Sequence, residues 1–276
     1  MISYEEALKI IAATTSRLAK IRLPSGNALG HVLAETVISP VNLPSFANTA
    51  MDGFALATRG HELPAGTEWE VLGEQAAGDG KTQAHEGAWE IMTGARIPDG
   101  FDAVIPIEQV QAIRTRDDGR PARISSHANI LPGQHVRHAG EDIALGEIAM
   151  EAGERLEPQH VMLLAGLGIR EVLVTRPPRV ALICTGRELI DDVSQPLVEG
   201  QIRNSNGPFL LARMAAAGAV VVHYETVSDE PDVFIASLKK ALSLMPDIVI
   251  STGAVSMGRY DFIPDALRGE NAEILF

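Results

Sequence analysis

Two loops in the first half of the chain carry polar side chains that could bind a ligand or activate it. Asn48 and Asp52 lie within five positions of each other and are followed by Gly53, and Thr93 precedes a second glycine. A carboxylate can bind a cation or accept a proton, and a hydroxyl beside an unhindered glycine amide can hydrogen-bond an oxyanion. Turns whose Asn and Asp side chains bond their own backbone show the same pattern. On spacing alone, a turn and a ligand site both stay open.

A third loop places a cation beside two adjacent carboxylates. Arg137 is followed closely by Glu141 and Asp142. Neighbouring carboxylates repel each other unless positive charge lies close by. The loop therefore predicts either a salt bridge to Arg137 or a divalent metal ion, and the sequence does not choose between them.

Three further polar segments follow predicted strands in the second half. A continuous apolar run, typical of a strand covered on both faces, occurs at 180–184. A β-branched stretch at 220–224 predicts the next strand, and 247–251 predicts a third, buried strand. The loops that follow them are rich in small, hydroxyl or acidic residues, at 185–188, 229–230 and 252–258. In open α/β sheets, ligands bind beyond the carboxyl ends of the strands, where free backbone amides favour anions. The convergence of these loops predicts a ligand site at that edge.

Several other classes of site and partner are not supported. Neither GxxxxGK[ST] nor GxGxxG occurs, which argues against a P-loop and a dinucleotide fingerprint. The eight histidines show no zinc-ligand spacing, and Cys184 falls inside a predicted strand as a small core residue. With 36 Asp and Glu against 23 Lys and Arg, the net charge of -13 argues against general nucleic-acid binding.

Cysteine usage and hydropathy indicate the compartment. A single cysteine excludes an intrachain disulfide and favours a reducing environment. The apolar stretches fall short of the roughly 18 residues that a membrane span needs. The N-terminal segment is acidic and amphipathic, unlike a signal peptide. We therefore expect a cytoplasmic protein that binds neither nucleic acid nor membrane.

The elements that must position these loops differ between the two halves. In the second half, helices predicted at 208–217 and 231–242 alternate with the three strands. This alternation predicts right-handed crossovers and a mostly parallel sheet in a three-layer α/β domain, residues 177–276. Before that domain, the segment from Arg176 to Arg179 (Arg-Pro-Pro-Arg) predicts a short, stiff linker.

The first half has a turn-rich centre flanked by helices. Helices are predicted at 3–19, where Ser3 and Glu6 have capping-box spacing, at 27–36 and at 157–167. Between them, closely spaced Gly and Pro and short apolar runs at 69–72 and 103–107 predict strands of a small β domain. We expect a multidomain α/β plus β protein. Its helical and extended region comprises residues 1–44 and 132–176, and a β domain, residues 45–131, is inserted in it.

Taken in order, these loops resemble the motifs of molybdopterin molybdotransferases, the bacterial relatives of the gephyrin E domain, which insert molybdenum into molybdopterin. The resemblance runs from the N-terminal helix to about Phe276 and is carried by Pro44–Ala55, Ile91–Ala95, Ala139–Asp142, Cys184–Glu188 and Gly253–Ser256. The sequence departs from the family pattern at Ala47, Arg187 and Ala254, where the family commonly has Asp, Asp and Gly. It also ends before a lysine-bearing segment and a small C-terminal β domain with which the family continues.

The resemblance implies the last step of molybdenum-cofactor assembly. Adenylyl-molybdopterin and molybdate bind, the dithiolene takes up molybdenum, and AMP is released with Mg²⁺ as cofactor. Catalytic roles are implied for Asp52, Thr93, Asp142 and Glu188. Substrate-binding roles are implied for Arg137, Asp229, Gly253, Ser256 and Asp261, and metal-ligand roles for Glu188, Asp229 and Asp261.

The resemblance also implies partners. The family is dimeric, so the helical and extended region is expected to mediate formation of a homodimer. Asp52 of one subunit would then meet Glu188 of the other. The molybdopterin adenylyltransferase of the same pathway is an expected protein partner.

Two other functions stay open at this point. The α/β half also resembles the molybdopterin adenylyltransferase, which would consume ATP and molybdopterin without molybdate, although that enzyme lacks the N-terminal modules. The other alternative is a non-catalytic dimeric scaffold that binds molybdopterin or partner proteins. The absence of the family's C-terminal part from this sequence favours the scaffold.

Overall fold

The computed structural model describes residues 2–254 and 262–276 and divides into two compact units. One unit consists of the chain up to Glu35, Gly153–Val161 and Glu171–Phe276, and the other of Thr36–Ala152 and Met162–Arg170. None of the described helices combines the length and the hydropathy that crossing a membrane requires. The described residues form both helices and strands, so the protein is of mixed α/β class. The domain boundaries expected at residues 44, 131 and 176 stay predictions.

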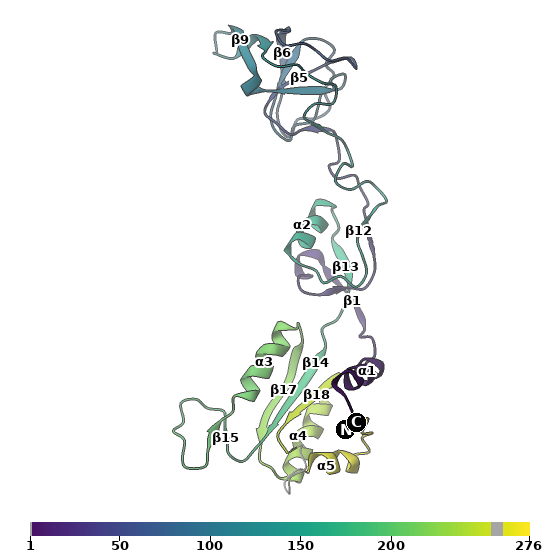
Figure 1. Ribbon diagram of the computed structural model, residues 1–276, viewed down its shortest axis with the longest axis vertical. Coiled ribbons are helices and arrows are strands. Elements are labelled where there is room, and N and C mark those ends of the chain that lie inside the picture. The colour runs from purple at the N-terminus through teal and green to yellow at the C-terminus, as the bar shows by residue number, and fades with distance from the viewer. Residues whose placement is uncertain (1, 255–261) are drawn as a thin grey trace. The chain divides into compact units, whose positions relative to one another are not determined.

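A parallel sheet forms the centre of the α/β part (Figure 1). β14 (Arg179–Thr185) lies between β17 (Val220–Val227) and β18 (Ile248–Thr252), and all three strands run parallel. Cys184 pairs in register with Thr226 on one side and Thr252 on the other. The carboxyl ends of the three predicted strands therefore come together at one edge.

Helices cover both faces of this sheet. α3 (Asn206–Ala216) packs on one face, and α4 (Pro231–Ser243) and α5 (Ile263–Gly269) pack on the other. The cluster on the α3 side contains Val180, Leu182, Cys184 and Met214. The cluster on the other side contains Ala181, Ile183, Phe234, Leu238 and Ile263. Alternate residues of β14 thus face opposite layers, as the continuous apolar run predicts, and Cys184 is a buried core residue.

The N-terminal helix α1 (Tyr4–Thr14) begins with the predicted capping box. Glu6 N donates to Ser3 Oγ at 3.2 Å, and Ser3 N donates to Glu6 Oε2 at 2.8 Å. The helix ends before the expected Ala19. The chain then forms β1 (Lys20–Pro24), which pairs antiparallel with β13 (Glu171–Thr175), and β13 also pairs with β2 (Val32–Leu33).

The helix expected at 27–36 is wrong. The chain forms a 3-10 turn at Ser25–Asn27, passes through Gly30 with a φ of 80°, and enters β2, where Val32 pairs with Thr175. A positive φ interrupts a helix, and a β-branched residue suits a strand better than a helix. The helix expected at 157–167 is confirmed as α2 (Pro158–Gly166).

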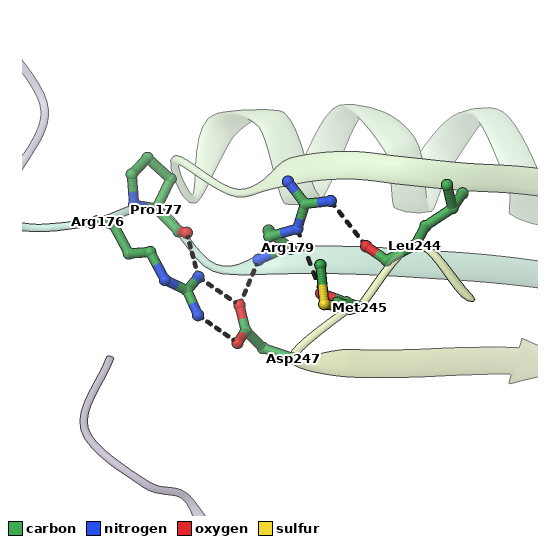
Figure 2. Close-up of polar contacts among 6 residues, drawn as sticks. All are labelled: Arg176, Pro177, Arg179, Leu244, Met245 and Asp247. Carbon is green, nitrogen blue, oxygen red and sulfur yellow. Dashed lines mark hydrogen bonds and ion pairs between the residues drawn. The ribbon is translucent and has the colours of Figure 1, made fainter. Parts of the chain in front are cut away.

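One carboxylate, Asp247, holds the linker between β13 and β14 (Figure 2). The Arg176 guanidinium donates twice to it, Nη1 to Oδ2 at 2.7 Å and Nη2 to Oδ1 at 2.6 Å. The backbone N–H of Arg179 also donates to Oδ2, at 2.7 Å. These bonds, those of Arg176 first, lower the pKa of Asp247 to about 2. Because Asp247 directly precedes β18, the stiff linker is tied to the parallel sheet.

The other unit contains a six-stranded, mostly antiparallel sheet in the order β8-β5-β7-β6-β10-β9. Its strands are β5 (Gly53–Leu56), β6 (Glu68–Gln75), β7 (Ala88–Ile91), β8 (Ala103–Pro106), β9 (Val110–Thr115) and β10 (Pro121–Ser126). Phe54 and Leu56 belong to one apolar cluster and Ala55 to a second, so both faces of β5 are covered. The strands expected at 69–72 and 103–107 are confirmed.

Three short strand pairs complete the fold. β3 (Val37–Ile38) pairs with β12 (Ile148–Met150), and β4 (Asn48–Thr49) pairs with β11 (Val136–Arg137), both antiparallel. In the α/β part, β15 (Leu189–Ile190) pairs in parallel with β16 (Ile202–Arg203). β4 and β15 adjoin residues of the predicted site.

Candidate functional site

Asp52 and Thr93, from two different loops, are in direct contact. Gly53 at the start of β5 pairs with Ile91 at the end of β7, which brings residue 52 next to the loop after β7. The backbone N–H and the hydroxyl of Thr93 both donate to Asp52 Oδ1, at 2.6 and 2.7 Å. These bonds, the hydroxyl bond first, lower the pKa of Asp52. Asp52 is therefore an exposed, ionised carboxylate whose Oδ2 makes no hydrogen bond with the residues that the structure describes.

Gly53 fixes the position of the Asp52 loop. A Cβ atom on residue 53 would lie 2.0 Å from the carbonyl oxygen of Ile105 in β8. β5 thus approaches β8 more closely than any side chain allows. The carbonyl of Asp52 also accepts a hydrogen bond from Ile107 N at 3.1 Å. The backbone on both sides of Asp52 is therefore held in place.

The neighbouring Asn48 and Thr49 have a structural part. Gly94 N donates to the Thr49 carbonyl at 2.9 Å, and Thr49 N donates to the Ala95 carbonyl at 3.1 Å. The Thr49 hydroxyl and the Asn48 amide both bond carbonyls two residues away in their own turn. The turn interpretation therefore holds for these two residues, whereas Asp52 reaches across to another loop.

Arg137 forms ion pairs with both carboxylates of the acidic pair that follows it. It lies in β11 opposite Asn48, its guanidinium donates to Asp142 Oδ1, and its Nε lies 3.8 Å from Glu141 Oε1. The hydrogen bond to Asp142 raises the pKa of Arg137. Of the two alternatives that the sequence leaves open, the structure contains the salt bridge. β4 pairs with this segment along one edge and with the loop after Thr93 along the other.

Arg96 is a candidate that no pattern in the sequence marks. It pairs with Asn48 in an isolated bridge, and its guanidinium carbon lies 5.7 Å from the centre of the Phe46 ring. Its Nη2 lies 3.8 Å from Asp99 Oδ1, while its Nε is buried without a hydrogen-bond partner among the described residues. A buried donor without a partner is rare in folded proteins and marks this position as unusual. Its setting depends on the pairing with β4, which the sequence does not reveal.

In the α/β unit, Glu188 and Asp229 lie at the carboxyl edge of the parallel sheet. Gly186 N donates to the carbonyl of Val227, the last residue of β17, at 3.0 Å, and Arg187 N donates to Asp229 Oδ2 at 3.3 Å. The Glu188 carboxylate folds back over Gly186, where a Cβ atom would lie 2.9 and 3.0 Å from its two oxygens. The loops after β14 and β17 therefore meet, as the strand order requires.

A cavity of about 280 Å³ opens at this edge. It is lined by Arg187, Ser228, Asp229 and Glu230. Its volume is close to the lower end of the range for small-molecule sites, about 300 Å³. A cation, a hydroxyl and two carboxylates in one cavity can hold an anionic group and a divalent cation side by side.

Gly253 brings the loop after β18 into close contact with the end of β14. A Cβ atom on Gly253, whose φ is 88°, would lie 2.4 Å from the carbonyl oxygen of Thr185 and 2.5 Å from its hydroxyl. The Thr185 hydroxyl donates to the carbonyl of Thr252 at 3.0 Å. Ser256 and Asp261, predicted for the same site, lie outside the described residues. Within 2–254 and 262–276, no three His, Cys, Asp or Glu side chains form a metal-binding group.

A hydrogen-bond network centred on Asn204 positions the loop that follows Glu188. Asn204 Nδ2 donates to Asp191 Oδ1 and to Thr226 Oγ1, both at 3.0 Å, and the Tyr224 hydroxyl donates to Asp191 Oδ1 at 2.8 Å. Burial, the largest cause, raises the pKa of Tyr224, so its hydroxyl keeps the proton that it donates. The sequence signal for Asn204 is weak, an Asn-Ser-Asn run before a helix.

Both groups of residues fall within regions that match protein families. Residues 2–168 match the MoeA N-terminal region (domain I and II), and residues 181–274 match a probable molybdopterin binding domain. The chain belongs to the MoeA family. The first matched region contains Asp52 and Thr93, and the second contains Glu188, Asp229 and Gly253. The first group therefore lies in the MoeA N-terminal region and the second in the probable molybdopterin binding domain.

Relatives and solved structures agree with the MoeA assignment. Two proteins named molybdopterin molybdenumtransferase, from Staphylococcus epidermidis and Staphylococcus aureus, are 36% and 34% identical to the chain. The alignments cover 100% of this chain, which spans 65% of the length of each relative. The crystal structure of a molybdopterin biosynthesis MoeA protein from Pyrococcus horikoshii has a TM-score of 0.76 and 31% identity, over 92% of this chain and 66% of that one. A second MoeA structure from Pyrococcus has a TM-score of 0.73 and 27% identity, over 98% of this chain and 66% of that one.

Proposed function

We propose that this chain carries the catalytic and substrate-binding domains of a cytoplasmic molybdopterin molybdotransferase. This transferase inserts molybdenum from molybdate into adenylyl-molybdopterin and releases AMP. Membership of the MoeA family and the names of the relatives support a role in molybdenum-cofactor biosynthesis. The observation that carries the proposal is the carboxyl edge of the parallel sheet, where Arg187 and Asp229 line a cavity of about 280 Å³ beside Glu188.

The cavity suits the anionic part of the substrate. The Arg187 guanidinium and the Ser228 hydroxyl would bind oxygens of the phosphoanhydride through charge-assisted hydrogen bonds. Gly253 leaves room for the backbone to press against Thr185, so the loop that begins there, with Ser256, would hold the pterin end. The substrate is thus expected to lie across the ends of β14, β17 and β18.

The carboxylates at this edge fit a divalent cation. The Glu188 carboxylate makes no hydrogen bond with another described residue, and Asp229 accepts one long bond, 3.3 Å, from Arg187 N. Carboxylate oxygens that are not already satisfied are the ligands that Mg²⁺ prefers. Glu188 and Asp229, together with Asp261, would hold Mg²⁺, which when bound would neutralise phosphate charge and polarise the phosphoanhydride.

Asp52 and Thr93 suit orientation better than proton abstraction. A carboxylate whose pKa is lowered is a weak base at neutral pH, but it remains a strong hydrogen-bond acceptor. With Oδ1 held by Thr93, Asp52 Oδ2 would orient a water or a reacting hydroxyl. On the other side of β4, Asp142 would take part in catalysis and Arg137 would bind substrate.

We also propose that the site is completed in a homodimer. Asp52 of one copy would meet Glu188 of the second, with residues 1–44 and 132–176 mediating dimerisation. The two groups of candidate residues lie in different units of the chain, which is compatible with assembly from two copies. The molybdopterin adenylyltransferase would supply the adenylylated substrate.

AMP release tests the proposed reaction. The protein is mixed with adenylyl-molybdopterin, molybdate and Mg²⁺, and AMP is measured by chromatography. We expect release that requires molybdate. Glu188→Gln, which keeps the size of the side chain and removes its charge, should lower the rate of release about a hundredfold. Glu273→Gln, an exposed position in the same unit, is the matched control and should retain it.

Other outcomes would point to the alternatives. Wild-type protein that releases no AMP, or a Glu188→Gln variant as active as the control, would contradict the molybdotransferase. Consumption of ATP and molybdopterin without molybdate would indicate an adenylyltransferase. Binding of molybdopterin that survives Glu188→Gln, with no turnover in either protein, would indicate a scaffold.

A further inference from the structure

A second cavity lies at the opposite end of the parallel strands. It has a volume of about 340 Å³ and shares no lining residue with the cavity at the carboxyl edge. Five segments line it: Leu18, Leu29–Val32, Arg155, Thr175–Pro178 and Ala217–Gly218. Pro178 directly precedes β14, and Gly218 lies just before β17, so the cavity adjoins the amino ends of these strands. It is therefore distinct from the proposed catalytic edge.

Apolar side chains form much of the wall of this cavity. Leu29 and Val32 line it and are 54% and 37% exposed, so both have apolar surface that a ligand can bury. Burial of such surface is favourable in proportion to its area. Pro177 and Pro178 add a wall segment whose backbone is restricted. The cavity therefore offers a preformed surface for an apolar group.

The charge of the lining is unusual for this chain. The described residues that line the cavity include no Asp or Glu, although the sequence has 36 acidic residues against 23 Lys and Arg. They do include Arg155, Arg176 and His31. Arg176 is neutralised by Asp247, so Arg155 is the residue that brings uncompensated positive charge. An anion is the complementary ligand.

The backbone of Arg155 is held in place, and its exposed side chain makes no ion pair with a described residue. Its backbone pairs with Val32 in an isolated antiparallel bridge. Its Nη2 lies 4.0 Å from the position that a Cβ atom would take on Gly30 and on Gly218, so the guanidinium faces backbone that carries no side chain. It makes no hydrogen bond or ion pair with another residue in the described part of the chain. A free guanidinium fork binds a carboxylate through two parallel hydrogen bonds.

We propose that this cavity binds a small amphipathic carboxylate. Its carboxylate pairs with Arg155, and its apolar body lies against Leu18, Leu29 and the two prolines. The volume is within the range of small-molecule sites, which starts at about 300 Å³. The cavity shares no residue with the proposed catalytic and substrate-binding groups, so its binding can be tested apart from the transferase activity. Leu18, Leu29 and Arg155 belong to the region proposed to mediate dimerisation.

Isothermal titration calorimetry with octanoate tests the proposal. Octan-1-ol keeps the apolar body without the charge, and acetate keeps the charge without the body. We expect octanoate to bind at least about tenfold more tightly than either, because each lacks one of the two contacts. Arg155→Gln should weaken octanoate binding about tenfold, whereas Arg213→Gln, an exposed arginine of α3 outside the cavity, should change it less than about twofold.

Further readouts locate the ligand and guard against misfolding. The amide resonances of Gly30 and Gly218 should shift on addition of octanoate, and those of Ser228 and Asp229 should not. Leu29→Glu, at an exposed position, places a carboxylate in the wall and should abolish binding by repulsion. Circular dichroism of each variant reports folding. Octan-1-ol binding as tight as octanoate, or folded Arg155→Gln with unchanged affinity, would overturn the proposal, as would unchanged protein that binds no octanoate.

Discussion

The two groups of candidate residues are built differently. Asp52 is held by two short hydrogen bonds from Thr93, and nearby Arg137 and Asp142 pair with each other. At the edge of the parallel sheet, the Glu188 carboxylate has no hydrogen bond within the described residues, and Asp229 has one of 3.3 Å. The carboxylates of the first group already accept short hydrogen bonds from the chain, whereas those of the second accept only one long bond from the described residues. This contrast is the basis of our proposal that the sheet edge binds the cation and the Asp52 group orients a reacting group.

The largest effect is expected from Gly53→Ala. The added Cβ would lie 2.0 Å from the Ile105 carbonyl oxygen, so β5 and β8 must separate. We expect a loss of at least about 3 kcal/mol in the free energy of unfolding of this unit, because the collision is with buried backbone. Urea denaturation followed by tryptophan fluorescence measures it, since both Trp69 and Trp89 lie in this unit. Gly80→Ala, where the Cβ meets no atom within 4 Å, is the control, and equal stability of the two variants would contradict the expectation.

Glu188→Gln and Asp52→Asn separate cation binding from orientation. We expect Glu188→Gln to lower kcat about a hundredfold and to raise the Mg²⁺ concentration needed for half-maximal rate, because a metal ligand loses its charge. Asp52→Asn should lower kcat about tenfold with an unchanged Mg²⁺ requirement, because the amide oxygen can still orient a group. Turnover measured across a Mg²⁺ series distinguishes them. A shifted requirement in Asp52→Asn alone would reverse the assignment.

Acid should weaken the α/β unit through Asp247. Its folded-state pKa, about 2, lies below the ordinary value of 3.8, so the stabilisation is complete above about pH 4 and is lost as pH falls towards 2. Asp247→Asn should lower Tm by about 3 °C or more at pH 7, and the difference from wild type should shrink between pH 4 and pH 2. Differential scanning calorimetry across this range measures it. Asp117→Asn, in an exposed turn of the other unit, serves as the control, and a Tm difference that did not change with pH would be inconsistent with an ionised Asp247.

The smallest effect is expected from Thr93→Val. The substitution removes the hydroxyl bond to Asp52 Oδ1 and leaves the backbone bond in place. The pKa of Asp52 should therefore rise, because the hydroxyl bond is the larger of the two causes that lower it. It should stay below 3.8, because the backbone bond remains. Carbon NMR of the carboxyl group during an acid titration measures it. Thr93→Ser keeps the hydroxyl and should leave the pKa of Asp52 low; an equal rise in both variants would show that the hydroxyl has no such effect.

Local patterns in the sequence predict most of the α/β unit. Short apolar and β-branched segments mark the three parallel strands, and Ser3 and Glu6 mark the capping box, because each signal lies within a few residues. The expected helix at 27–36 failed for the opposite reason. Val32 pairs with Thr175, a partner from a distant segment, and that pairing overrides local propensity.

The candidate site is predictable in residue type but only partly in contacts. The motifs contain Asp52 and Thr93, yet their hydrogen bonds arise from the pairing of Gly53 with Ile91, which no local pattern encodes. Neither Arg96 nor Arg155 lies in a sequence motif. The position of Arg96 depends on its bridge to Asn48 of β4, and that of Arg155 depends on its bridge to Val32. Spacing can therefore nominate a side chain, but tertiary pairing decides what it meets.

Asp247 accepts hydrogen bonds from both ends of the Arg-Pro-Pro-Arg segment, which limits how the junction between β13 and β14 can be re-engineered (Figure 2). One inserted residue would move Arg176 by about 3 Å along the chain and out of reach of the carboxylate, while the Arg179 amide stayed bound. A chimera joined between β13 and β14 must therefore take Arg176, Arg179 and Asp247 from the same parent. The junction tolerates exchange of neighbouring modules only at a fixed length.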